Sequence, residues 1–140
     1  MKKIFVIASM LLMVNVYGQA RKELNFGLIG VNYEIPIHKD ITIAPGVSTN
    51  TNLDWLTFNA RANYYFDSLF GITDSAWDVY GGVGAGFATY NGDDDDDDGF
   101  DIAAHAGARW FWNDKWGVYA ELGGGSLQGA TGSVGVTVKL

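Results

Sequence analysis

The fold of this chain can be predicted from residues 100–124, FDIAAHAGARWFWNDKWGVYAELGG. Apolar residues occupy every second position from residue 100 to residue 112, and polar or small residues occupy most of the positions between them. After a polar turn at residues 113–115 the alternation resumes and continues to residue 124. Because successive side chains of a β-strand point to opposite faces, this stretch predicts a β-hairpin with one apolar and one polar face.

The same alternation predicts seven strands, joined by polar segments, and no helix. They lie at residues 23–37, 41–48, 54–66, 77–90, 100–112, 116–124 and 133–140. In the first segment the apolar residues change from even to odd positions near Ile29 and Gly30, and a β-bulge there would keep them on one face. Antiparallel membrane barrels usually have an even number of strands, so we expect eight. The eighth strand is missing, degenerate, or produced by splitting residues 21–30 from the rest of the first segment.

The first 20 residues predict a cleaved secretory signal peptide. Lys2 and Lys3 precede an apolar run at residues 4–16, and Gly18 and Ala20 are placed as in a cleavage site. The run is shorter than the roughly 20 apolar residues of a spanning helix. We therefore expect residues 21–140 to be the mature protein and to form a single domain.

The composition limits the class of protein. The chain has no cysteine, so an exported domain of this size must be held together by a sufficient core or by a closed sheet. The net charge is −7, and six aspartates follow one another at residues 93–98. A nucleic-acid partner would require a basic surface, so the charge argues against one.

Aromatic residues indicate which face of the sheet contacts lipid. Small and aliphatic residues fill the middle of the apolar faces, whereas aromatic residues gather at the strand ends in two belts. Such girdles are typical of outer-membrane barrels. One belt is predicted to contain Tyr64, Phe66, Trp77, Trp110, Trp112 and Trp116, and the other Phe87 and Phe100. The pattern favours a small antiparallel up-and-down transmembrane β-barrel.

The polar face then lines the lumen and carries charges. With a turn at residues 113–115, Gly107 lies opposite Glu121, and Arg109 lies diagonal to it within reach of a long side chain. Because a buried charge needs a partner, we predict an ion-pair network inside the barrel. It links Arg61 and Arg109 to Glu121 and to Asp78.

The aspartate run matches the opening of a calcium-binding loop. Asp94, Asp96, Asp98 and Asp101 supply alternate carboxylates, and Gly99 permits the turn. The twelfth position counted from Asp94 is His105, where such a loop has a bidentate glutamate. A solvated acidic loop that condenses divalent cations weakly is therefore favoured over a specific calcium site. No other cofactor is predicted.

Several stretches of the sequence resemble a known family. The stretches GGVGAGF, AGARWFWNDKWGVYAELG and GSVGVTVKL, together with the signal peptide, are similar to small, porin-like outer-membrane β-barrel proteins of Gram-negative bacteria, especially the short barrels of Bacteroidetes. The resemblance implies that the barrel has eight strands and lies in the lipid of the outer membrane. It also implies that the barrel assembly machinery inserts it. The last residue is Leu140, where the family often has phenylalanine.

The sequence supports two hypotheses for the function, each from a different class of protein. The first is an outer-membrane barrel with a filled polar interior and an acidic extracellular loop, in a structural or surface-interaction role whose partner the sequence does not identify. Its tight turns at residues 38–40 and 113–115 would face the periplasm, because periplasmic turns are short. The second is a soluble periplasmic barrel that binds a small apolar ligand. No serine has a plausible His/Asp arrangement, so we predict no enzyme.

Overall fold

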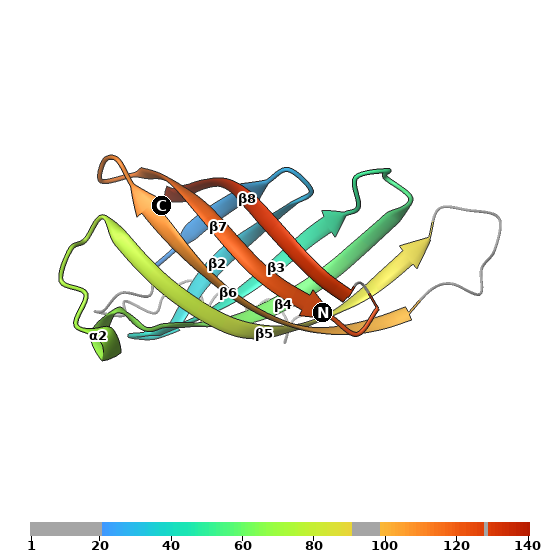
Figure 1. Cartoon of the computed structure of the whole chain (residues 1–140), viewed down its shortest axis with the longest axis horizontal. Coiled ribbons are helices and arrows are strands. Elements are labelled where there is room, and N and C mark those ends of the chain that lie inside the picture. The colour runs from blue at the N-terminus through green and yellow to red at the C-terminus, as the bar shows by residue number, and fades with distance from the viewer. Residues whose placement is uncertain (1–20, 91–98, 128) are drawn as a thin grey trace, which may run out of the picture.

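The computed structural model describes residues 21–90, 99–127 and 129–140, within which lies one closed β-barrel (Figure 1). Eight antiparallel strands follow one another around the barrel in chain order, and the first pairs with the last. They are β1 (Glu23–Gly27), β2 (Gly30–His38), β3 (Ile41–Thr49), β4 (Trp55–Tyr65), β5 (Trp77–Tyr90), β6 (Gly99–Phe111), β7 (Trp116–Gly125) and β8 (Gly129–Lys139). The predicted all-β, up-and-down barrel is confirmed.

The eighth strand comes from the segment in which the apolar parity changes. β1 and β2 are joined by a turn at Leu28 and Ile29, and Phe26 lies opposite Val31 in their ladder. The expected bulge is therefore a tight turn, because the chain reverses there and each strand keeps its own alternation. Of the three alternatives for the eighth strand, the split of the first segment holds.

Both termini of the described barrel lie at one end. The backbone N–H of Leu140 donates to the carbonyl oxygen of Lys22 over 2.9 Å, and Glu23 lies opposite Lys139. We call this the termini end; β2, β4 and β6 also finish there, since neighbouring strands are antiparallel. The opposite end, where β1, β3, β5 and β7 finish, is called the loop end.

The β6–β7 hairpin has the predicted register. Gly107 lies opposite Glu121, and the backbone N–H of Trp112 donates to the carbonyl oxygen of Trp116 over 3.2 Å. This register places the charged side chains of both strands on the same side of the sheet.

One short helix, α2 (Asp67–Phe70), lies between β4 and β5 at the termini end (Figure 1). The sequence predicts no helix there, because a single turn is too short to show a helical period of apolar residues. Gly71 ends it with a φ of 69°, a left-handed conformation that costs glycine little. Among the described residues, no helix is long and apolar enough to cross a membrane.

The apolar face of the sheet is the outer face of the barrel. Val83 and Leu122 are exposed in mid-strand positions, whereas Glu34 is fully buried in the lumen. Trp110 and Trp112 are 42% and 49% exposed. A soluble barrel that encloses an apolar ligand would bury this tryptophan face, so that alternative is wrong; an outer face of this kind suits surrounding lipid.

Glycines make room for aromatic rings that point into the lumen. Three such pairs lie directly opposite one another on neighbouring strands: Tyr80 and Gly107, Phe111 and Gly117, Tyr119 and Gly135. A Cβ atom on Gly107 would lie 2.7 Å from Tyr80 Oη and 2.8 Å from the carbonyl oxygen of Ala120. Glycine is needed at this position because any side chain would collide with the tyrosine and with the neighbouring backbone.

We expect Gly107→Ala to destabilise the barrel by about 1–3 kcal/mol, because the added methyl group overpacks the lumen against a fixed carbonyl group. Gly132→Ala is the matched control, since the nearest atom to its new Cβ would be Leu122 Cδ2 at 3.5 Å. Urea unfolding of both variants in lipid vesicles, followed by tryptophan fluorescence, measures the difference. Equal stability of the two variants would contradict this explanation of the glycine.

Candidate functional site

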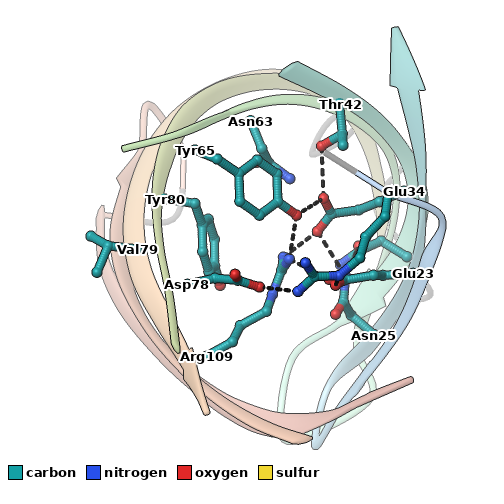
Figure 2. Close-up of polar contacts among 12 residues, drawn as sticks. Glu23, Asn25, Glu34, Thr42, Asn63, Tyr65, Asp78, Val79, Tyr80 and Arg109 are labelled. Carbon is teal, nitrogen blue, oxygen red and sulfur yellow. Dashed lines mark hydrogen bonds and ion pairs between the residues drawn. The ribbon is translucent and has the colours of Figure 1, made fainter. Parts of the chain in front are cut away.

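A group of charged and aromatic side chains fills the lumen near the termini end (Figure 2). We call it the lumen cluster, and its members are Arg21, Glu23, Glu34, Tyr65, Asp78, Tyr80 and Arg109. Strand alternation positions them: Asp78 and Tyr80 point into the barrel, while Val79 between them points out (Figure 2). The cluster therefore contains side chains from five strands, β1, β2, β4, β5 and β6, together with Arg21 from the segment before β1.

Arg109 lies at the centre of the lumen cluster and is only 2% exposed. Its Nη1 lies 2.5 Å from Glu23 Oε2, and its guanidinium also donates to Glu34 Oε1 and to the hydroxyl of Tyr65. The guanidinium carbon lies 4.2 Å from the ring centroid of Tyr80, a cation–π contact. One cation from β6 thus joins side chains from four other strands.

Glu34 has hydrogen-bond partners on both carboxylate oxygens. Tyr65 Oη and Thr42 Oγ1 donate to its Oε2 over 2.6 and 2.7 Å. Asn25 Nδ2 donates to its Oε1 over 2.9 Å, beside the bond from Arg109. A carboxylate buried in this way keeps its charge at tolerable cost, because both oxygens accept hydrogen bonds and a cation lies beside them.

Arg21 extends the cluster toward the periphery of the termini end. Its Nε lies 2.5 Å from Glu23 Oε1, and its Nη2 donates to Asp78. Its guanidinium carbon also lies 5.0 Å from the ring centroid of Phe111, and Lys139 Nζ lies 3.8 Å from the same centroid. Two cations therefore surround one buried aromatic ring at this end of the lumen.

Tyr80 connects the lumen cluster to a second ion pair nearer the middle of the barrel. Its hydroxyl donates to Glu121 Oε2 over 2.9 Å, and Arg61 Nη2 lies 2.6 Å from the same oxygen. Close by, His105 Nε2 lies 2.6 Å from Asn63 Oδ1. Ion pairs, hydrogen bonds and the cation–π contact between Arg109 and Tyr80 therefore form a continuous path from the termini end to the middle of the lumen.

The structure gives Arg109 a different partner from the one that we expected. Arg61 and Glu121 are brought together, but Arg109 pairs with Glu23 and Glu34, so the predicted pair of Arg109 and Glu121 is wrong. The reason lies in the register: Arg109 is two positions nearer the termini end than the residue opposite Glu121, and its side chain extends across the lumen.

Asp78 also has an unexpected partner, because it binds Arg21 and not a strand arginine. Alternation does not predict Arg21, Glu23 and Glu34 as members of the network, because all three lie in or before the segment in which the apolar positions change from even to odd. A signal for two of them exists: once β1 and β2 are separated, Glu23 and Glu34 occupy inward positions directly opposite one another.

Toward the loop end the lumen opens into a cavity of about 170 Å³. Its polar lining includes Asn59, Arg61, His105 and Glu121, and glycines from β5 and β7 lie between them. Because these glycines contribute no side chains, the cavity remains where the lumen cluster ends. The lumen is thus filled at one end and hollow toward the other.

Comparison with known proteins decides the family. The sequence profile described as outer membrane protein beta-barrel domain matches residues 9–139. This chain belongs to that family. The protein is therefore located in the outer membrane, and lipid surrounds its apolar face.

Two solved structures are similar to this outer-membrane barrel, each at 14% sequence identity. The N-terminal beta-barrel domain of Pseudomonas aeruginosa OprF aligns with a TM-score of 0.61 and covers 85% of this chain and 93% of that one. A chain described under the de novo design of transmembrane beta-barrels aligns with a TM-score of 0.59 and covers 85% and 91%. At 14% sequence identity, the similarity to these two structures shows a shared fold but not a shared function. No curated protein matches the sequence.

The aromatic side chains assigned to the termini-end girdle lie on the outer wall of this outer-membrane barrel. Tyr64, Trp77, Trp110, Trp112 and Trp116 are exposed, and Trp77 lies opposite Trp110 in the β5–β6 ladder. Phe66 is only partly exposed because its ring stacks on another aromatic ring. The positions agree with a belt at a membrane boundary.

The predicted calcium ligands are only partly within the described residues. Asp94, Asp96 and Asp98 lie outside them. Asp101 is buried, and its Oδ1 accepts hydrogen bonds from Ser126 Oγ at 2.9 Å and from the backbone N–H of Leu127 at 2.8 Å. In residues 21–90, 99–127 and 129–140, no group of three acidic, histidine or cysteine side chains could hold a metal ion. Asp101 therefore serves to hold the β7–β8 connection.

We expect Arg109→Gln to destabilise the protein by about 3–5 kcal/mol, because Glu23 and Glu34 would lose a buried cation. Arg61→Gln is the comparison, since the Arg61 and Glu121 side chains are 20% and 13% exposed and water replaces part of the lost contact. Adding Glu34→Gln to Arg109→Gln should recover part of the loss. Urea unfolding in vesicles gives the three values, and an Arg109→Gln cost no larger than that of Arg61→Gln would show that the cluster is not held by this cation.

Proposed function

We propose that this protein is a non-conducting outer-membrane barrel with a structural or surface-interaction role. The observation that carries the proposal is the lumen cluster, whose buried ion pairs and tyrosine rings occupy the lumen near the termini end (Figure 2). The interior of an eight-stranded barrel is just wide enough for side chains to fill it or for one small ligand, and not for a water-filled channel. A permeating ion would have to separate Arg109 from two carboxylates, and an unpaired buried charge is costly.

The proposal assigns no reaction to the protein. The groups that acid–base chemistry would use are engaged in holding the barrel together: His105 contacts Asn63, and Asp101 binds the β7–β8 connection. Glu121 is held by Arg61 and Tyr80. These contacts support a structural or binding role, because each of these groups is held by a neighbouring side chain or backbone group.

The proposal also gives the barrel an orientation, with the termini end in the periplasm and the loop end outside the cell. An even number of strands places both ends of the chain on one side, and an exported chain reaches the outer membrane from the periplasm. With this orientation β5 ends and β6 begins on the outer side. The acidic extracellular loop stays a prediction from the sequence, because residues 91–98 lie outside the described residues. Cleavage of residues 1–20, insertion by the barrel assembly machinery and closer kinship with Bacteroidetes barrels stay predictions from the sequence.

In planar bilayers the wild-type protein should give no stepwise conductance under conditions in which a water-filled porin does, because the lumen cluster blocks the path. A heat-dependent shift in gel mobility of the same sample shows that the barrel is folded. Regular conductance steps that increase in frequency with added protein would contradict a closed lumen.

Cysteine labelling tests the orientation, since the chain has no cysteine of its own. Asn52→Cys lies in the exposed β3–β4 connection at the loop end, and Asp114→Cys lies in the exposed β6–β7 turn at the termini end. A membrane-impermeant maleimide should label position 52 in intact cells and position 114 only after lysis. The reverse pattern would invert the proposed orientation.

A further inference from the structure

The outer wall of the barrel continues beyond the end of β4 as a row of three aromatic rings. Tyr64 lies on the exposed outer face of β4; the centroids of its ring and the Phe66 ring are 5.0 Å apart, and those of Phe66 and Phe70 are 5.6 Å apart in a stacked arrangement. We call these residues the aromatic row. A Cβ on Gly81 would lie 3.2 Å from Phe66 Cε2, so Phe66 covers β5 on its outer face. The aromatic row is therefore on the lipid side of the barrel.

Backbone and side-chain hydrogen bonds hold α2 against the end of the barrel. Asp67 is buried, and its Oδ1 accepts a hydrogen bond from the Val79 backbone N–H over 2.7 Å. The backbone N–H of Phe66 donates to the Val79 carbonyl oxygen over 2.8 Å. Ser68 Oγ donates to Asp40 Oδ1 over 3.2 Å, which attaches the helix to the β2–β3 turn. The helix is thus fixed to β5 and to the β2–β3 turn.

This attachment exposes two large apolar side chains. Leu69 is 68% exposed and Phe70 62% exposed, although Phe70 stacks on Phe66. The single charge of the helix belongs to Asp67, which is buried beneath it. The exposed surface of α2 is therefore uncharged and continuous, through the aromatic row, with the belt that lies at the membrane boundary.

We propose that α2 is an interfacial membrane anchor, in which Leu69 and Phe70 insert into the boundary between the headgroups and acyl chains of the bilayer that contains the barrel. Continuity with the lipid-facing wall identifies lipid as the occupant, since the same bilayer covers Tyr64 and Trp77. The anchor lies at one point of the circumference, beside β4 and β5. It fixes the depth of the barrel at that point and does not depend on which leaflet the termini end faces.

Site-specific fluorescence quenching tests this proposal. The variants Leu69→Cys and Phe70→Cys are labelled with an environment-sensitive nitrobenzoxadiazole dye, and the folded protein is placed in phosphatidylcholine–phosphatidylglycerol vesicles. Asp114→Cys, in the exposed turn at the same end of the barrel, is the matched control. Aqueous iodide and lipids with a nitroxide in the headgroup region serve as the two quenchers. A heat-dependent gel shift of each labelled variant shows that it has folded.

We expect iodide quenching at positions 69 and 70 to be about threefold or more weaker than at position 114, because the interface shields the dye from water. The headgroup nitroxide should quench positions 69 and 70 more strongly than position 114. Iodide quenching at 69 and 70 equal to that at 114 would overturn the proposal and leave this surface to water or to a periplasmic protein. The proposal would also be overturned if the headgroup nitroxide quenched positions 69 and 70 no more strongly than position 114.

Discussion

A charged side chain of a membrane-spanning strand cannot face lipid without a large cost, and this constraint determines how the barrel is assembled. Because side chains alternate along a strand, a slip of one residue would move every inward side chain to the outer face. In β1, such a slip would turn Glu23 and Asn25 outward and place Leu24 and Phe26 in a polar lumen. The alternation of β1 therefore excludes any register shifted by one residue, and β8 pairs with the register that keeps Glu23 and Asn25 inside.

Arg109 connects this local constraint to the closure of the whole barrel. Glu23 and Glu34 lie directly opposite one another in the β1–β2 ladder, an arrangement of like charges that is unfavourable by itself. Arg109 from β6 binds both of them, and although Glu23 also pairs with Arg21, Glu34 gains its cation only when that distant strand is in place. Buried ion pairs add little net stability, because desolvation offsets their attraction. We infer that this one contributes mainly specificity, since only the correctly closed barrel pairs all three charges.

The sequence reveals what depends on alternation within a strand and misses what depends on its ambiguous ends. The β6–β7 register and the inward position of Arg61 and Glu121 follow from strands whose alternation is unbroken. The partners of Arg109 do not, because Glu23 and Glu34 lie in a segment that reads as one strand until the turn at residues 28–29 is known. α2 escapes prediction for a different reason: its single turn depends on a hydrogen bond between Asp67 and β5, which no local pattern shows.

The unequal filling of the lumen follows from where its glycines lie. At the termini end, Tyr80 and Phe111 lie over glycines of the neighbouring strand, so small residues there admit large rings and the charges that contact them. Toward the loop end, Gly84 and Gly86 of β5 lie beside the side chains of Arg61, Asn59 and Thr57, and the glycines there leave space for a polar cavity. The structural requirement for a closed, charge-paired lumen is thus met in one half of the barrel. The other half encloses the polar cavity beside Arg61, His105 and Glu121.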